Sequence, residues 1–347
     1  MSRDMGTPQG PPPSSPPLRR RLTPDAYVAG VLDRQRGVLS RVITLIESRR
    51  PGDRDLARSV LTQLLPHAGN SLRLGVTGVP GAGKSTLIES LGRNLTRQGH
   101  RVAVLAIDPS SRITGGSILG DKTRMAELSR DPNAFIRPSP SGETLGGVAG
   151  KTREAMLACE AAGYDVVIVE TVGVGQSETM VADMVDFFLL VLIAGAGDEL
   201  QGIKRGLIEM ADLVAINKAD GDNRARALRA MTQYRNAIRL MVPSDSLWVP
   251  PVVTCSALEN TGLDAIWSDV LAHRAKFQHA GLFQERRRAQ AVRWMWDLVN
   301  EHIQRTLREG PEVQHLAACL ESDVQDGRTT AAAAAERIIQ ALGLKTG

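Results

Sequence analysis

The sequence predicts an α/β fold, a mostly parallel sheet with helices on both faces. Between residues 71 and 279, short apolar runs alternate with longer stretches of helical periodicity, which is typical of such a sheet. Ligands of parallel sheets bind at the carboxyl ends of the strands, so we expect the residues that follow each strand to carry the chemistry. The expected strands are 72–77, 102–107, 134–137, 165–170, 187–193, 212–217 and 251–254.

Three segments flank this central region. Residues 1–21 hold six prolines and end in three arginines, which predicts a disordered, proline-rich tail. Residues 22–70 contain two stretches of helical periodicity separated by Gly52 and Asp53, and they predict an N-terminal helical region. Residues 280–347 predict a C-terminal helical arm, with one helix from about residue 281 and a second at 330–342.

The first helix of the arm is apolar on more than one side. Trp294 and Trp296 are two residues apart, so they cannot lie on the same face of a helix. Either both sides are buried within one chain, or one side is the surface of a homodimer. The sequence leaves these two alternatives open.

Composition and charge exclude several classes of function. The 42 lysines and arginines exceed the 38 aspartates and glutamates by only four, too small a surplus to indicate binding to nucleic acid or to a membrane. The three cysteines are far apart and form no C-x-x-C pair, which is typical of a reducing cytoplasm without disulfides or zinc. The longest apolar run, 187–197, is too short to span a bilayer, and the N-terminus shows no secretory signal. We therefore expect a cytoplasmic protein.

The central motif of the chain is a phosphate-binding loop. Residues 78–85 read G-V-P-G-A-G-K-S between an expected strand and a helical stretch, which is the P-loop pattern in its required context. Backbone N–H groups and the helix N-terminus would surround the β-phosphate, Lys84 would reach the β- and γ-phosphates, and Ser85 would ligate Mg²⁺. The expected nucleotide contacts are Gly78, Val79, Pro80, Gly81, Ala82, Gly83, Lys84, Ser85 and Thr86.

Two acidic residues follow other strands of the same sheet. Asp108 and Glu170 each come at the end of a buried strand. A carboxylate beside a P-loop can hold Mg²⁺ directly or through water, so we favour a metal role over that of an exposed loop or capping residue. The backbone N–H of Gly173, in the loop after Glu170, could meet the γ-phosphate.

A third motif predicts which base is bound. Residues 217–220 read N-K-A-D at the end of the sixth strand. The Asp220 carboxylate can accept from guanine N1–H and the 2-amino group, whereas adenine would leave it unpaired, so we expect GTP and not ATP. Asn217 can bond the base edge or brace the P-loop, and the Lys218 stem can cover the ring. A backbone N–H near Ala257, between Ser256 and Leu258, can meet O6.

The combination of these motifs with two long loops resembles the MeaB/ArgK family of P-loop GTPases, the G-protein chaperones of adenosylcobalamin-dependent methylmalonyl-CoA mutase. The resemblance covers about residues 25–345. Ala194 departs from the family, which usually has proline there, and puts no chemistry in doubt. The stretches that carry the resemblance are 75–85, 108–111, 114–125, 170–178, 195–206 and 217–220.

This resemblance implies a SIMIBI-type fold, the dimerising branch of P-loop GTPases, with N-terminal helices and a C-terminal dimerisation arm. It implies slow GTP hydrolysis that a B12-dependent acyl-CoA mutase accelerates, and gated loading of adenosylcobalamin, which the partner binds. The family's adenosyltransferase is a further candidate partner. Carried onto this sequence, the metal set is Ser85, Asp108, Asp121 and Glu170, and the catalytic set is Lys84, Asp121, Gly173 and Lys204.

Two other functions compete with this interpretation. A nickel-inserting maturation GTPase of the same fold branch needs Cys and His ligands near the site, and the six histidines form no such cluster with the cysteines in the sequence. A nucleic-acid-associated GTPase is disfavoured because the basic residues are not concentrated with aromatic ones.

Overall fold

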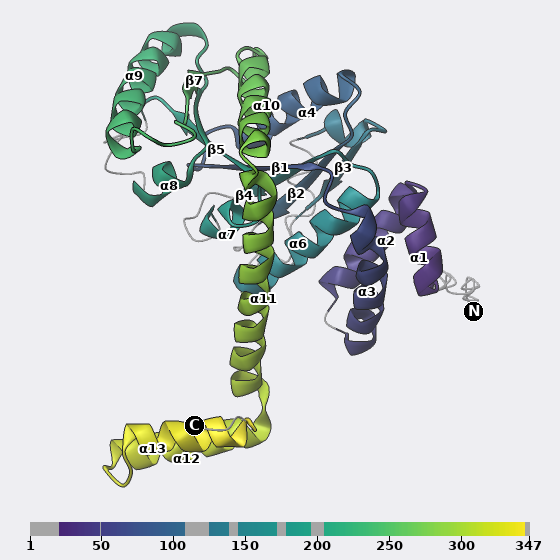
Figure 1. Cartoon of the computed structure of the whole chain (residues 1–347), viewed down its shortest axis with the longest axis vertical. Helices are drawn as coiled ribbons and strands as arrows, with labels where there is room; N and C mark the ends of the chain where they lie inside the picture. The colour runs from purple at the N-terminus through teal and green to yellow at the C-terminus, as the bar shows by residue number, and fades with distance from the viewer. Residues whose placement is uncertain are drawn as a thin grey trace, which may run out of the picture.

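The computed structural model describes residues 21–48, 50–107, 125–138, 145–171, 178–195 and 205–343. Its centre is a seven-stranded sheet in which neighbouring strands run parallel (Figure 1). The predicted strands are confirmed, and their bounds differ from the expected ones by no more than one residue. They are β1 (Leu72–Gly78), β2 (Val102–Ile107), β3 (Ala134–Arg137), β4 (Val166–Thr171), β5 (Phe187–Ile193), β6 (Leu213–Asn217) and β7 (Val252–Thr254).

The strand order places the P-loop strand at the centre of the sheet. The order is β3-β2-β4-β1-β5-β6-β7, so β1 lies between β4 and β5. Gly78 of β1 pairs with Val191 of β5, and Val76 pairs with Glu170 of β4. Because parallel strands end at one edge of the sheet, the residues after β1, β4 and β6 come together there.

Helices cover both faces, as expected. One face packs against α4 and α10, through residues such as Val76 and Leu189. The opposite face packs against α6 and α7 near β2 and β4, and against α8 and α9 near β5 and β6. These helices are α4 (Lys84–Arg97), α6 (Leu145–Ala161), α7 (Glu178–Ala182), α8 (Arg205–Met210), α9 (Arg224–Met241) and α10 (Leu263–His279), with short 3-10 turns at Leu65–His67, Leu128–Arg130 and Gly221–Asn223.

The N-terminal region forms three helices that share a core with α6. They are α1 (Pro24–Leu32), α2 (Arg36–Glu47) and α3 (Pro51–Leu64). The Thr23 hydroxyl caps α1 by accepting from the Ala26 N–H at 3.3 Å, and proline at the first helical position fixes its start. The expected break at Gly52 and Asp53 is wrong, because Pro51 starts α3 and puts both residues in its first turn.

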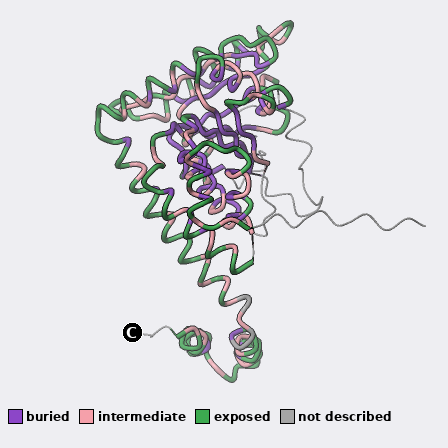
Figure 2. The backbone as a smooth tube through the Cα atoms, turned by 90° about the vertical axis from the view of Figure 1, so that its right-hand side faces the viewer, coloured by how far each residue is buried: buried purple, intermediate pink, exposed green. Residues whose placement is uncertain are grey.

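The C-terminal arm leaves the sheet along one long helix. This helix, α11 (Leu282–Glu309), begins beside α10, packs on α6, and then extends away from the rest of the chain (Figure 1). At its far end, α12 (Pro311–Gln325) and α13 (Ala331–Ala341) pack on each other. Figure 2 shows the buried residues gathered in the sheet region and the arm mostly exposed or intermediate. None of the described helices is both long and apolar enough to cross a membrane.

The two arm tryptophans have different surroundings. Trp294 lies against α6, where its Nε1 is 3.9 Å from the position of a Cβ added to Gly150 and the Arg153 guanidinium lies 5.6 Å from its ring. Trp296 is 57% exposed, and Val292, Met295, Leu298 and Val299 beside it are at least 40% exposed. The alternative in which one chain buries both sides of this helix is therefore wrong for the chain by itself.

Candidate nucleotide-binding site

The P-loop connects β1 to α4 through three glycines at positive φ. Gly78, Gly81 and Gly83 have φ of 147°, 78° and 85°. At Gly78 an added Cβ would lie 1.9 Å from the Val191 carbonyl oxygen, and at Gly83 it would lie 2.7 Å from Asn217 Nδ2. Glycine is needed at both positions, because a side chain at Gly78 would collide with the β5 backbone and one at Gly83 with the Asn217 amide. The loop then leads into α4, a 14-residue helix whose N-terminus favours an anion.

Lys84 is buried at the start of α4 and turns back onto the loop. Its Nζ donates to the carbonyl oxygens of Gly78, at 2.9 Å, and Val79, at 3.3 Å. Both acceptors are neutral, and a charged phosphate oxygen is a stronger partner for an ammonium group. Lys84 therefore lies where it can exchange these carbonyls for phosphate, which is the role the sequence predicted for it.

Ser85, in the first turn of α4, lies beside Glu170, near the end of β4. The Ser85 hydroxyl donates to Glu170 Oε1 at 2.8 Å, and Glu170 is buried. A hydroxyl and a carboxylate oxygen are the donor atoms that Mg²⁺ prefers, so these residues fit the expected metal. Beneath them, the Thr77 and Thr171 hydroxyls are 2.8 Å apart and link the ends of β1 and β4.

Asn217 braces the P-loop from below. Its Nδ2 donates to the Ala82 carbonyl at 2.8 Å, and its Oδ1 accepts from the Ala257 N–H at 3.0 Å. The side chain is 1% exposed, so both bonds are shielded from water. Of the two roles that the sequence left open for Asn217, the structure shows the brace. One amide thus joins the phosphate loop, β6 and the segment after β7.

The contact between Asn217 and Ala257 bears on which backbone N–H after β7 can donate to guanine O6. Since the Ala257 N–H already donates to Asn217, it is not free to meet guanine O6. The next N–H, that of Leu258, has no acceptor within the part of the chain that the structure describes, and Leu258 is exposed. The expectation of an O6 donor near Ala257 stays a prediction, and the Leu258 N–H is its candidate.

Asp220 is held by the segment after β7. The Ser256 hydroxyl donates to Asp220 Oδ2, and Ser256 Oγ accepts from the Glu259 N–H at 3.1 Å. Lys218 has a positive φ of 58° and an exposed side chain, and the Asn223 amide donates to its carbonyl at 2.7 Å. These contacts hold the Asp220 carboxylate and the Lys218 backbone in place, and the expected contacts of Asp220 and Lys218 with the base stay predictions.

The sequence alone did not indicate two supporting residues. The Ser90 hydroxyl of α4 donates to the Ala257 carbonyl at 2.7 Å. Gly262 has a φ of 77°, and a Cβ there would lie 2.6 Å from the Thr254 carbonyl oxygen. Ser90 carries no sequence signal, whereas a glycine closing the loop after β7 could have been recognised as a tight turn.

The remaining predicted residues lie outside the described ranges. These are Asp108, Asp121, Gly173 and Lys204, so their roles stay predictions. Among the residues that the structure describes, no group of three or more His, Cys, Asp or Glu side chains could hold a metal ion.

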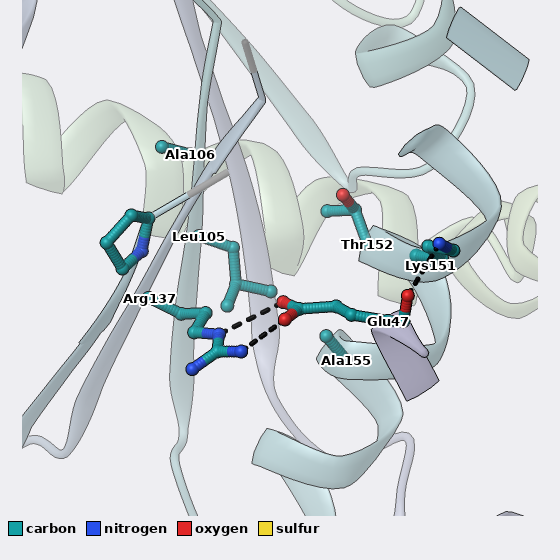
Figure 3. A pocket seen from close by; sticks show the side chains of 8 residues that line it. Glu47, Leu105, Ala106, Arg137, Lys151, Thr152 and Ala155 are labelled. Atoms are coloured by element: carbon teal, nitrogen blue, oxygen red, sulfur yellow. Dashed lines mark hydrogen bonds and ion pairs between the residues drawn. The ribbon is translucent and has the colours of Figure 1, made fainter. Parts of the chain in front are cut away.

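Two pockets lie away from this site. Figure 3 shows one of about 10 Å³, where Arg137 Nε donates to Glu47 Oε1 at 3.0 Å and Lys151 Nζ donates to the Glu47 carbonyl at 2.8 Å. It has room for about one water, and its ion pair fastens α2 to β3 at the edge of the sheet. The other, of about 320 Å³, lies beside the start of β6 between α8 and α9, with Trp248 and Phe277 in its lining.

The chain is similar over most of its length to proteins of one family. A family model described as "Methylmalonyl Co-A mutase-associated GTPase MeaB" matches residues 39–312. The chain is 52% identical over 269 residues to GTPase ArgK of Escherichia coli K12, covering 78% of this chain and 81% of that protein. It is 44% identical over 327 residues to the mitochondrial methylmalonic aciduria type A homolog of Mus musculus, covering 91% of this chain and 79% of that protein. A crystal structure of a LAO/AO transport system kinase matches with a TM-score of 0.75 and 39% identity, covering 94% of this chain and 99% of that one.

Proposed function

This chain belongs to the MeaB family of methylmalonyl-CoA mutase-associated GTPases, and we propose that it is a GTP-hydrolysing chaperone of a B12-dependent acyl-CoA mutase, most simply methylmalonyl-CoA mutase. As a member of this family it is a P-loop GTPase. The observation that carries the proposal is the family match over residues 39–312, which spans both the P-loop and the N-K-A-D motif.

In the proposed cycle, the residues of this chain bind and orient the nucleotide. Lys84 exchanges the Gly78 and Val79 carbonyls for the β- and γ-phosphates, and α4 points its N-terminus at them. Asp220 accepts from the guanine edge while Ser256 holds its carboxylate. Mg²⁺, held by Ser85 and Glu170, would neutralise phosphate charge when bound. Asp108, Asp121, Gly173 and Lys204 keep the roles that the resemblance implies.

The finer parts of the proposal concern partners. We place adenosylcobalamin on the mutase, because the chain carries no cobalamin-binding D-x-H-x-x-G motif. An adenosyltransferase is a further candidate partner, and the cytoplasm is the proposed compartment. We also propose a homodimer, because a contiguous apolar side of α11 around Trp296 stays exposed in the single chain.

The test is GTP turnover with and without the cognate mutase. Alone, the chain should turn over slowly, at about 10⁻⁴ to 10⁻² s⁻¹, because no arginine finger is evident in the sequence. The mutase should raise the rate by about tenfold or more, and co-purification of the two proteins should depend on whether GTP or GDP is present. Lys84→Ala is the control, because its association should no longer respond to nucleotide. A mutase that neither binds nor stimulates the wild type would contradict the chaperone role and leave GTP hydrolysis standing.

A further inference from the structure

The loop between β7 and α10, residues 255–262, is closed by its own backbone, and we name it the base loop. Ser256 and Thr261 exchange two backbone hydrogen bonds, both at 3.0 Å, which form an antiparallel bridge across it. Gly262 ends the loop at a φ of 77°, where a Cβ would lie 2.6 Å from the Thr254 carbonyl oxygen. The bridge therefore leaves residues 257–260 as the tip of the base loop.

The helix that follows the P-loop, α4, contacts this tip at two places. The Ser90 hydroxyl donates to the Ala257 carbonyl at 2.7 Å. One helical turn later, the side-chain amides of Asn94 and Asn260 exchange hydrogen bonds at 2.9 and 3.1 Å. Ala257 is buried, whereas the pair of amides lies on the surface. The helix α4 therefore joins the P-loop to the base loop.

The Ser90 contact fixes the orientation of one peptide group, the one between Ala257 and Leu258. A trans peptide is planar, and its carbonyl and its N–H point in opposite directions. The carbonyl of this peptide points at Ser90, so the Leu258 N–H points away from α4. The preceding peptide is held as well, because the Ala257 N–H donates to Asn217 Oδ1 at 3.0 Å. Two side chains thus hold consecutive peptide groups at the tip.

The N–H that Ser90 orients is available to a ligand. The Leu258 N–H has no acceptor among the residues that the structure describes, and Leu258 is 82% exposed. The next N–H, that of Glu259, donates instead to Ser256 Oγ at 3.1 Å. Ser256 also holds the Asp220 carboxylate, which we expect to accept from the guanine edge. A fixed and unused donor therefore lies in the same short loop that holds the expected base acceptor.

A donor at this point suits guanine and not adenine. Guanine carries an acceptor, O6, where adenine carries an amino group, which is a donor. The bond from Ser90 also polarises the peptide, because a carbonyl that accepts a hydrogen bond makes the N–H of its own peptide a stronger donor. Without that bond the peptide can rotate, and a rotated peptide presents its carbonyl where O6 needs an N–H.

We infer that Ser90 is a positioning residue for guanine recognition. It acts through the Ala257–Leu258 peptide, which it holds so that the Leu258 N–H meets O6. The hydroxyl on the P-loop helix thereby contributes to the choice of base. This inference rests on the proposed guanine site and is independent of the mutase.

The test is calorimetry of the full chain with three nucleotides. GDP and inosine diphosphate both carry the 6-oxo group, whereas 6-thio-GDP has in its place a sulfur, which is a weak acceptor. Ser90→Ala removes the hydroxyl and keeps a good helix former, and Ser90→Thr keeps a hydroxyl. Asn94→Ala is the matched control, because it removes the other contact between α4 and the base loop without touching the Leu258 peptide.

Ser90→Ala should weaken the binding of GDP and of inosine diphosphate by the same factor, about fivefold, because one hydrogen bond to O6 is misaligned. Its loss for 6-thio-GDP should be no more than about twofold, since that nucleotide already makes the contact poorly. Ser90→Thr and Asn94→Ala should stay within about twofold of the wild type for all three nucleotides.

Equal losses for the three nucleotides in Ser90→Ala would overturn the inference, because Ser90 would then support the loop as a whole and not the contact with O6. An unchanged affinity of Ser90→Ala for GDP would overturn it too, as would a wild type that binds 6-thio-GDP as tightly as GDP. Comparable binding of ADP and GDP by the wild type would instead refute the guanine assignment itself, and the role of Ser90 with it.

Discussion

Asn217→Ala should weaken both the fold and the nucleotide site, and its effect can be worked out from two contacts. The substitution leaves the Ala82 carbonyl and the Ala257 N–H without their hydrogen-bond partner. Asn217 is only 1% exposed, so water reaches these groups poorly. A buried group that loses its hydrogen bond costs about 1–3 kcal/mol. Two such groups, with some relief from water entering the vacated volume, should lower the free energy of unfolding by about 3 kcal/mol.

Urea denaturation at constant pH measures this loss, and calorimetry with GDP measures the effect on binding. The affinity for GDP should fall by about tenfold or more, because the Asn217 amide no longer ties the P-loop to the segment after β7. Asn94→Ala is the matched control. Its amide also exchanges hydrogen bonds with a second amide, that of Asn260 at 2.9 Å, but on the surface, so it should cost less than about 1 kcal/mol. Equal losses in the two variants would refute the view that Asn217 is a buried brace.

Three more outcomes are expected. Burial raises the pKa of the Glu154 carboxyl to about 7 from 4.5. The free energy of unfolding of the wild type should therefore fall by about 2 kcal/mol as pH rises from 4.5 to 7, because the unfolded chain ionises this carboxyl more readily. Urea denaturation of Glu154→Gln at pH 5, 6, 7 and 8 should show no such loss. Asp220→Asn should weaken GDP binding and favour xanthosine diphosphate in calorimetry, since an amide can donate to the extra carbonyl; unchanged guanine preference would contradict the base assignment. Light scattering should give about twice 37.4 kDa for the wild type and a lower mass for Trp296→Arg, whereas a wild-type monomer at micromolar concentration would exclude the dimer.

The sequence by itself determined the architecture, and it predicted the main site residues. Strands such as 102–107 and 187–193 were found at their observed bounds because a buried parallel strand is a short, continuous apolar run. The P-loop and the N-K-A-D motif were found because both depend on residues a few positions apart, in a backbone geometry that the motif itself requires. The break before α3 was misplaced, because Gly52 has turn propensity but Pro51 at the first helical position decides the boundary.

Only the tertiary structure decided what joins these parts. Asn217 meets Ala82 and Ala257 across 135 and 40 positions of sequence, and no local pattern encodes a side-chain bond to a distant backbone group. For the same reason the contact of Ser90 with Ala257 could not be predicted. The two-residue spacing of Trp294 and Trp296 required two helix faces. Only the position of α6 fixed which tryptophan is covered, because packing, unlike periodicity, depends on where a second element lies.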